Sequence, residues 1–177
     1  DTLDMVRIQG ISFSGTWDIP KRYIKTLGDN IRFNHIVVVD VTNQNITLIE
    51  KSGTEGCVRS MNPSTSGVHN PPYAIETPVG LFIIQENKTK MFYQKDGSTE
   101  IEGYAPYASR FTNGGYIHGV PTNNPEGIII EYSPTLGTIP RSHMCVRTAS
   151  SHAKLIFDTA KPLQSLVFVI DSQSLTL

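Results

Sequence analysis

The segment "RSHMCVR", residues 141 to 147, gathers side chains whose types and spacing could do chemistry. Cys145 is the most reactive of them, because a cysteine deprotonated to the thiolate is a nucleophile. His143 and Arg147 each lie two positions from Cys145, and alternate residues of an extended chain point to the same side. Positive charge from both would favour the thiolate. The segment therefore predicts a nucleophilic cysteine, provided that a base lies near it.

The best candidate for that base is His118, in the segment "YIHG". It stands at the end of a predicted strand, where the following Gly119 leaves the adjacent carbonyl accessible. A backbone oxygen there can hold the imidazole in one tautomer through its second ring nitrogen. Backbone N–H groups around Met144 and Cys145 could point at a developing oxyanion.

Each of these residues also has an ordinary structural interpretation. A lone cysteine in a β-rich domain is commonly a small buried hydrophobic residue. A lone histidine is commonly a surface residue or a core residue with its hydrogen bonds satisfied, and an arginine is commonly solvated or part of a weak surface ion pair. Only the combination of the three types favours an enzyme.

Two other interpretations of the segment involve residues outside it. The chain has two cysteines, so Cys57 and Cys145 could form one disulfide bridge. Because Cys57 falls in a predicted core strand, we expect it to be a buried free thiol instead. A metal site could be built from the following set: His118, His143 and Cys145, with His69 or His152. The His-x-Cys spacing lacks the paired ligand spacings of common zinc sites, so no metal is expected.

The elements that must position these residues are mostly strands. Runs of β-branched residues and turn clusters predict strands at 35–41, 46–50, 55–62, 79–86, 90–95, 114–120, 127–132 and 165–171. The first two form a predicted hairpin, and 79–86 with 90–95 form a predicted strand pair. Residues 62–78 are rich in Pro, Ser, Thr, Asn and Gly, which is typical of a loop.

One helix is well marked in the sequence. The segment "SSHAKLIFDTAKP" begins at residue 150 and has apolar residues at helical spacing. Ser150 or Ser151 is the expected N-cap and Pro162 the expected stop. A weaker helix is predicted at 19–28, with Pro20 in its first turn and Gly28 as C-cap. The sequence thus predicts a mainly β domain with one helix, preceded by a less certain segment.

Bulk properties narrow the class of protein. The 177 residues fit one domain or a domain with an N-terminal extension. A net charge of −1 gives no basic surface for nucleic acid or an anionic membrane. No apolar run is long enough to span a bilayer, and no signal-peptide pattern is present. Because the chain begins without methionine, we expect a piece of a longer protein, in which any membrane attachment lies in other segments.

The two motifs taken together resemble a known family. "IHG" followed by "SHMCVR" is similar to the signature of the L,D-transpeptidase catalytic domain, a cell-wall cysteine enzyme. "VVVDVTNQNITLIEK", "ETPVGLFII", "YAPYASRF", "SSHAKLIFDTA" and "SLVFVID" resemble further parts of the family in the expected order. The resemblance covers about residues 34 to 172. It implies a mainly β fold, a mixed and sandwich-like sheet with one helix after the catalytic cysteine loop. Residues 34–177 would be the catalytic domain, and 1–33 an N-terminal extension, a linker or the end of an upstream domain.

The resemblance also implies a role for each motif residue. Cys145 would be the nucleophile and His118 its base, in preference to His143, with the Gly119 carbonyl orienting the imidazole. The remaining residues would contact substrate, line the site or serve the oxyanion, and these are Tyr116, Ser142, His143, Met144 and Arg147. The implied reaction is acyl transfer on a peptidoglycan tetrapeptide stem, with release of D-Ala and formation of a 3→3 cross-link. A carboxypeptidase side activity would accompany it.

The resemblance implies partners and a location as well. The substrates would be donor and acceptor stem peptides, carbapenems would acylate Cys145, and no metal or organic cofactor would be needed. The enzyme would work outside a bacterial cell, in its wall. Two alternatives remain at this point, a sortase-like transpeptidase and a non-catalytic wall-binding module. A sortase would have its essential arginine far downstream of the cysteine, whereas here no arginine follows Arg147.

Two features depart from the family pattern. Met144 stands where the family usually has glycine, and a glycine there suits a backbone with positive φ. Either the loop is not left-handed here, or Met144 is held under strain. The second departure is the stretch 119–141 between the two motifs, which is several residues longer than the family usually has. It is expected to be a packed excursion rather than a wall of the substrate site.

Overall fold

The computed structural model describes residues 4–9, 14–24, 32–95, 97–129 and 135–173. By internal contacts the chain divides into two compact units, Asp1–Arg32 and Phe33–Leu177. Each is described by itself.

The first unit contains one antiparallel strand pair and a short turn. Strands β1 (Met5–Gln9) and β2 (Thr16–Pro20) pair with Arg7 opposite Asp18. The guanidinium of Arg7 forms a two-pronged ion pair with the Asp18 carboxylate at 2.9 Å. The weaker predicted helix is wrong over its described part, because only η1 (Lys21–Tyr23) forms one 3₁₀ turn before Ile24 returns to extended backbone. Residues 25–28 of that prediction lie outside the described residues.

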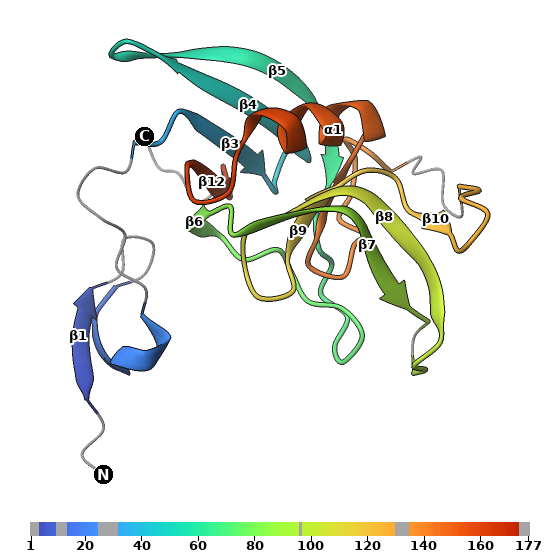
Figure 1. Ribbon diagram of the computed structural model, residues 1–177, viewed down its shortest axis with the longest axis horizontal. Coiled ribbons are helices and arrows are strands. Elements are labelled where there is room, and N and C mark those ends of the chain that lie inside the picture. The colour runs from blue at the N-terminus through green and yellow to red at the C-terminus, as the bar shows by residue number, and fades with distance from the viewer. Residues whose placement is uncertain (1–3, 10–13, 25–31, 96, 130–134, 174–177) are drawn as a thin grey trace. The chain divides into compact units, whose positions relative to one another are not determined.

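The second unit is built on one mixed sheet (Figure 1). Its strands are β3 (His35–Asp40), β4 (Asn45–Ser52), β5 (Glu55–Thr65), β6 (Gly80–Ile83), β7 (Glu86–Gln94), β8 (Ile101–Arg110), β9 (Tyr116–His118), β10 (Thr122–Asn123), β11 (Val146–Thr148) and β12 (Ser165–Ile170). Their order is β10-β8-β9-β11-β5-β4-β3-β12-β6, and β7 also pairs with β8. The long β5 joins the two halves, because its first part pairs with β4 and its last residues pair with β11.

The core lies between these two halves, which makes the fold sandwich-like. Alternate residues of β3, β4 and β12 are buried, as the two-residue period of a strand requires, and β9, β11 and α1 supply the facing side chains. The buried set is Val37, Val39, Ile46, Leu48, Ile84, Phe111, Ile117, Val146, Ile156, Ala160, Val167 and Val169. The predicted mainly β class is confirmed, and α1 (Ser150–Thr159) is the single α-helix among the described residues.

Several boundaries differ from the sequence predictions. β5 continues to Thr65, so the loop predicted at 62–78 begins several residues later than predicted. The predicted pairing of 79–86 with 90–95 is wrong, because β6 pairs with β12 and β7 pairs with β8. Helix α1 is capped by Ala149 and not by a serine side chain. Of the segment 127–132, residues 127–129 are described, and Ile129 makes an isolated bridge to Thr122.

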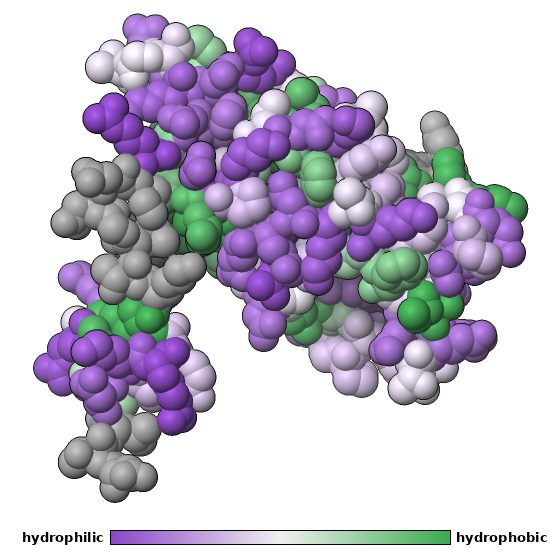
Figure 2. Space-filling view, in the orientation of Figure 1, coloured by the Kyte–Doolittle hydropathy of each residue, from purple (hydrophilic) through white to green (hydrophobic). Residues whose placement is uncertain are grey.

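The surface of this unit is mainly polar on the face that carries α1. Figure 2 shows hydrophilic residues over most of that face, with smaller apolar patches between them. Within the described parts of the chain, no helix combines the length and apolar character that a membrane crossing demands.

Candidate active site

Two short neighbouring strands bring the predicted residues together. β9 and β11 run parallel, with Ile117 opposite Val146 and His118 opposite Arg147. Ile117 and Val146 are fully buried in the core. Because side chains alternate across a strand, His118 and Arg147 point to the opposite face, and Cys145 immediately precedes β11 on that face. Residues far apart in the sequence thus meet on one side of the sheet.

Cys145 is nearly buried, with 9% of its surface exposed. Its Sγ lies 3.6 Å from the carbonyl oxygen of Gly114, which accepts a hydrogen bond from the thiol. Burial raises the pKa of the Cys145 thiol to about 11, and it outweighs a hydrogen bond from the Tyr116 backbone and the charge of Arg147, which lower it. The Cys145 thiol is therefore neutral at neutral pH.

His118 is buried as well and is fixed in one orientation. Its Nδ1–H donates to the Gly119 carbonyl oxygen at 2.7 Å, so the neutral ring presents Nε2 as an acceptor. Burial lowers the pKa of His118 to about 4. The Gly119 hydrogen bond opposes that effect and the nearby Arg147 charge adds to it. His118 and Cys145 line the same pocket, and a neutral imidazole and a neutral thiol fit the resting state of a general base and the group that it would deprotonate.

The loop that carries Cys145 is held by hydrogen bonds from a segment distant in the sequence. Ser142 donates through its hydroxyl to the Cys145 carbonyl, and its own backbone pairs with Ser66 and Val68 at 2.9 Å. The Thr77 hydroxyl donates to the Met144 carbonyl at 2.8 Å and accepts from the Gly67 amide at 2.8 Å. Residues 66–68, at the start of the segment between β5 and β6, and Thr77, near its end, therefore support residues 142–145.

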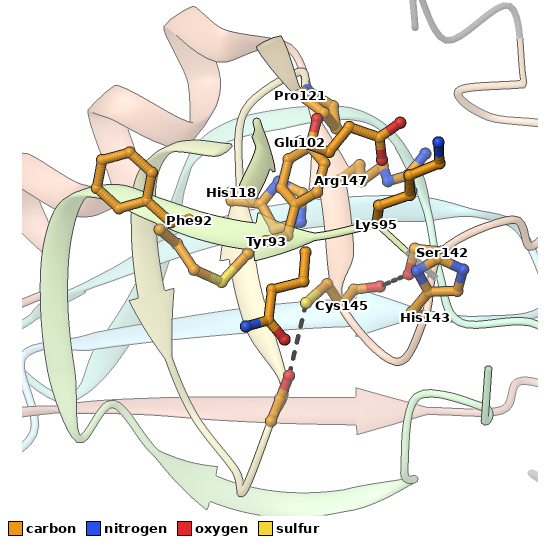
Figure 3. Close-up of a pocket in the computed structure, with 13 residues that line it drawn as sticks. Phe92, Tyr93, Lys95, Glu102, His118, Pro121, Ser142, His143, Cys145 and Arg147 are labelled. Carbon is orange, nitrogen blue, oxygen red and sulfur yellow. Dashed lines mark hydrogen bonds between the residues drawn. The ribbon is translucent and has the colours of Figure 1, made fainter. Parts of the chain in front are cut away.

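A pocket of about 540 Å³ opens beside Cys145 (Figure 3). Five predicted residues line it, and these are His118, Ser142, His143, Cys145 and Arg147. The other lining residues were not predicted, and these are Met91, Phe92, Tyr93, Gln94, Lys95, Glu102, Gly114 and Pro121. Most of them come from β7 and the residue after it. In Figure 3, Lys95, Glu102 and Arg147 lie on one side of the pocket and Phe92 on the other.

Some predicted residues occupy less central places. His143 is exposed at the pocket and sits in a bend, so strand alternation does not govern its direction. The Tyr116 side chain packs against Cys145, and its hydroxyl bonds to Glu86 and Lys88 at 3.2 Å, outside the pocket lining. Tyr116 reaches the nucleophile through its backbone. The aromatic run "KMFYQK" was the available signal for the β7 wall, and "ETP" was the signal for Thr77.

The disulfide and metal interpretations do not fit this geometry. Cys57 and Cys145 are both free, and the expected burial of Cys57 is wrong. Cys57 lies in the part of β5 that pairs only with β4, where almost every side chain from Glu55 to Arg59 is exposed. Among the residues that the structure describes, no three His, Cys, Asp or Glu side chains are grouped to bind a metal ion.

Residues 34–169 match the family of the L,D-transpeptidase catalytic domain. The chain belongs to that family. The match spans both motifs and every strand from β3 to β11, and it favours an L,D-transpeptidase over a sortase. No curated protein matches the sequence.

Solved structures of L,D-transpeptidases share the fold of this chain. One, in complex with imipenem, is 20% identical, with a TM-score of 0.58 over 77% of this chain and 59% of the other. One from Mycobacterium smegmatis is 19% identical, with a TM-score of 0.56 over 77% and 58%. L,D-transpeptidase 3 from Mycobacterium tuberculosis, with a faropenem-derived adduct, is 18% identical, with a TM-score of 0.56 over 78% and 60%. The chain thus spans about three fifths of the length of these structures.

Against the L,D-transpeptidase pattern, Met144 is the departure that the structure resolves. Its φ is 100°, in the region that favours glycine. Of the two alternatives set out from the sequence, the strained one is found. Such a residue costs about 1–3 kcal/mol and persists only when its surroundings hold it. Thr77 and Gly67 supply that hold, because a β-carbon on Gly67 would lie 2.7 Å from the Met144 Cα.

Proposed function

We propose that this chain is the catalytic part of a peptidoglycan L,D-transpeptidase, with Cys145 as nucleophile and His118 as base. The observation that carries the proposal is the parallel pairing of β9 with β11. It brings a fixed imidazole and a thiol to the same face, beside a pocket large enough for a peptide. The catalytic domain is assigned to residues 34–177, and residues 1–33 to an extension or the end of an upstream domain.

The first half of the reaction is acylation. His118 Nε2 takes the proton of the Cys145 thiol as Sγ bonds to the carbonyl carbon between the third and fourth stem residues. The carbonyl oxygen becomes an oxyanion, which the Met144 and Cys145 amides stabilise. The carbon–nitrogen bond then breaks, the D-Ala nitrogen takes the proton from His118, and the third residue stays on Cys145 as a thioester.

The second half returns the enzyme to its starting state. The amine of an acceptor stem attacks the thioester carbon and loses a proton to His118. The carbon–sulfur bond breaks, the sulfur recovers that proton, and a 3→3 amide cross-link is released. If water attacks instead, the product is a free carboxylate, which would be the carboxypeptidase side activity. Because the resting pair is neutral, thiolate forms only as the substrate is attacked.

The other pocket residues have supporting roles in this proposal. Arg147 lies close enough to act electrostatically on both Cys145 and His118, so it fits a group that steadies the loop or faces the substrate carboxylate. Ser142 holds the Cys145 carbonyl, His143 faces substrate from solvent, and the Tyr116 backbone bonds to the sulfur. The partners are stem peptides of a bacterial wall, so the site of action is outside the cell.

Carbapenems are proposed as covalent inhibitors of the same cysteine. The similar structures that contain imipenem and a faropenem-derived adduct support β-lactam binding by proteins of this fold. In this chain the Cys145 sulfur would open the lactam ring and keep the acyl group, and His118 would pass the proton to the released nitrogen.

Intact-mass spectrometry with imipenem tests the proposal. Wild type and Cys57→Ser are expected to gain one imipenem mass, and Cys145→Ser is expected to gain none. No adduct on wild type, or an adduct on Cys145→Ser, would contradict the assignment. Incubation with purified tetrapeptide muropeptides should then give 3→3 dimers and free D-Ala. A non-catalytic wall-binding module would give neither.

A further inference from the structure

The side chain of Met144 lies against a glycine turn from another part of the chain. A β-carbon built on Gly115 would lie 3.5 Å from the Met144 Sδ, and one built on Gly114 would lie 3.8 Å from it. The thioether therefore occupies the space beside the turn Thr112–Gly115, where neither glycine has a side chain. Methionine suits such a space, because it is unbranched and flexible.

That turn controls the surroundings of the nucleophile. The Cys145 thiol donates to the Gly114 carbonyl oxygen at 3.6 Å. In Figure 3 a dashed line at the Cys145 sulfur marks this bond. The backbone of Tyr116, directly after the turn, also hydrogen-bonds to this sulfur. One carbonyl and one amide from a single short segment thus set the direction of the sulfur. The Gly114 carbonyl belongs to the turn itself, so a shift of the turn moves this contact, while Tyr116 is fixed next to it as the first residue of β9.

The backbone of Met144 is held in place by contacts with two other residues. Thr77 binds its carbonyl at 2.8 Å, and the bare Gly67 backbone packs against its Cα. The strained φ of 100° is retained at residue 144 although a glycine would relieve it. A glycine would also remove the side chain that packs against Gly114 and Gly115 of the turn.

We propose that Met144 is a positioning residue, whose thioether braces the Thr112–Gly115 turn and so fixes the Cys145 sulfur in the orientation that attacks the acyl donor. The proposal rests on the proposed function, and it adds a role for the side chain that is separate from the Met144 amide. Met144 does not line the pocket, so the brace acts on the chemical step and not on binding.

The test compares three variants by imipenem acylation kinetics. Met144→Ala keeps the strained backbone and loses the brace, Met144→Leu keeps both, and Met144→Gly loses both. Alanine and glycine are expected to lower the maximal acylation rate about tenfold or more, which is about 1.4 kcal/mol of barrier. The half-saturating imipenem concentration should stay within about threefold of wild type. Leucine should restore the rate to within about threefold.

The same data separate bracing from a general loss of structure. Partial unfolding lowers the fraction of protein that forms an adduct, whereas a misplaced sulfur lowers the rate constant of the folded fraction. A wild-type rate in Met144→Gly would overturn the proposal, because methionine would then be a tolerated replacement for glycine. A rate in Met144→Leu as low as in Met144→Ala would overturn it as well, because the packing volume would have no effect.

A second measurement does not depend on the proposed function. Peptide mapping after iodoacetamide treatment at pH 9 follows the accessibility of Cys145 directly. The alanine and glycine variants should be labelled at Cys145 several-fold faster than wild type and the leucine variant, because a loosened turn uncovers the sulfur. Equal labelling of all four proteins would overturn the brace even if imipenem did not react with any of them.

Discussion

The two cysteines of this chain differ in burial, because Cys57 is exposed and Cys145 is buried. Cys57 is exposed on β5, opposite Glu50 of β4, in the part of the strand pair whose outer side chains face solvent. Cys145 is 9% exposed and lies between the Gly114 carbonyl, the Tyr116 amide and the strand that carries His118. The thiol that reagents reach easily lies opposite a carboxylate, and the thiol that shares a pocket with His118 is shielded.

The difference teaches that the more accessible thiol is not the one that the proposed mechanism uses as nucleophile. A neutral buried thiol is protected from chance alkylation and oxidation, since these reactions need the thiolate. It becomes reactive when a substrate carbonyl, an adjacent base and oxyanion donors are present together. In the proposed mechanism, substrate-like reagents select Cys145 and simple alkylating reagents select Cys57.

The largest expected effect comes from removing His118, the proposed base. Gln in place of His118 can still donate to the Gly119 carbonyl, but it cannot accept the thiol proton. General-base catalysis typically contributes 10²–10⁴-fold, so the imipenem acylation rate of His118→Gln should fall by about that factor. Stopped-flow or quenched mass spectrometry measures the rate.

His143→Gln is the matched comparison for that variant. His143 is an exposed residue of the same pocket, so its loss should slow acylation by about tenfold at most. If His143→Gln lost more activity than His118→Gln, the proton transfer would belong to His143 and the proposed assignment would be wrong. The fixed tautomer of His118, with Nδ1 on Gly119 at 2.7 Å, is the physical reason for expecting the opposite.

A smaller effect is expected when the two cysteines compete for iodoacetamide. Because the pKa of the Cys145 thiol is raised to about 11, only about one molecule in a thousand carries the thiolate at pH 8. Cys57 should therefore be labelled at least about tenfold faster at that pH, as peptide mapping would measure. Labelling of Cys145 should rise about tenfold per pH unit up to about pH 10.

The opposite order of labelling would break the comparison. If Cys145 reacted first at pH 7 with no rise above that pH, the resting state would be a thiolate paired with an imidazolium. Such a state would require burial to raise the pKa of the Cys145 thiol by less than the charge of Arg147 lowers it. Cys145→Ser and Cys57→Ser, labelled separately, assign each rate to its own residue.

The two cysteines also show which parts of the fold the sequence predicts and which it does not. The alternating β-branched pattern of β3 and β12 and the helical spacing of α1 were read correctly, because these elements bury one face on a single core. The pairing of β6 with β12 was missed, because partners distant in sequence are chosen by the whole sheet. Burial of Cys57 was wrong for a related reason. β5 is longer than the core that it crosses, and its first half extends past it.

For the site, sequence motifs supplied the residues on β9, β11 and the loop before β11. They could not supply the β7 wall, because β7 reaches the pocket only through its pairing with β8. Thr77 was part of a quoted segment, but its role depends on a loop that folds back under Met144. The motif could not show whether the backbone at Met144 is left-handed, and the observed φ of 100° shows that it is.

The smallest expected effect on the acylation rate comes from removing the Thr77 hydroxyl, which supports the loop that carries Cys145. Thr77 is buried, and its hydroxyl serves both the Gly67 amide and the Met144 carbonyl at 2.8 Å. Thr77→Val keeps the shape and leaves both groups without this partner, which costs about 1–3 kcal/mol of unfolding free energy. Chemical denaturation measures that loss, and imipenem acylation should slow by about three- to tenfold because residue 144 gains freedom.

Thr77→Ser keeps the hydroxyl and provides the control. It should recover most of the acylation rate, with a small stability loss from the missing methyl group. Stability and rate need not move together, because the hydroxyl holds the Met144 carbonyl, one residue before Cys145, whereas the methyl contributes only to packing. If Thr77→Val lost stability but acylated at the wild-type rate, the orientation of Cys145 would depend on the Thr112–Gly115 turn and not on the Thr77 hydroxyl. The shielded cysteine would then be positioned from one side only.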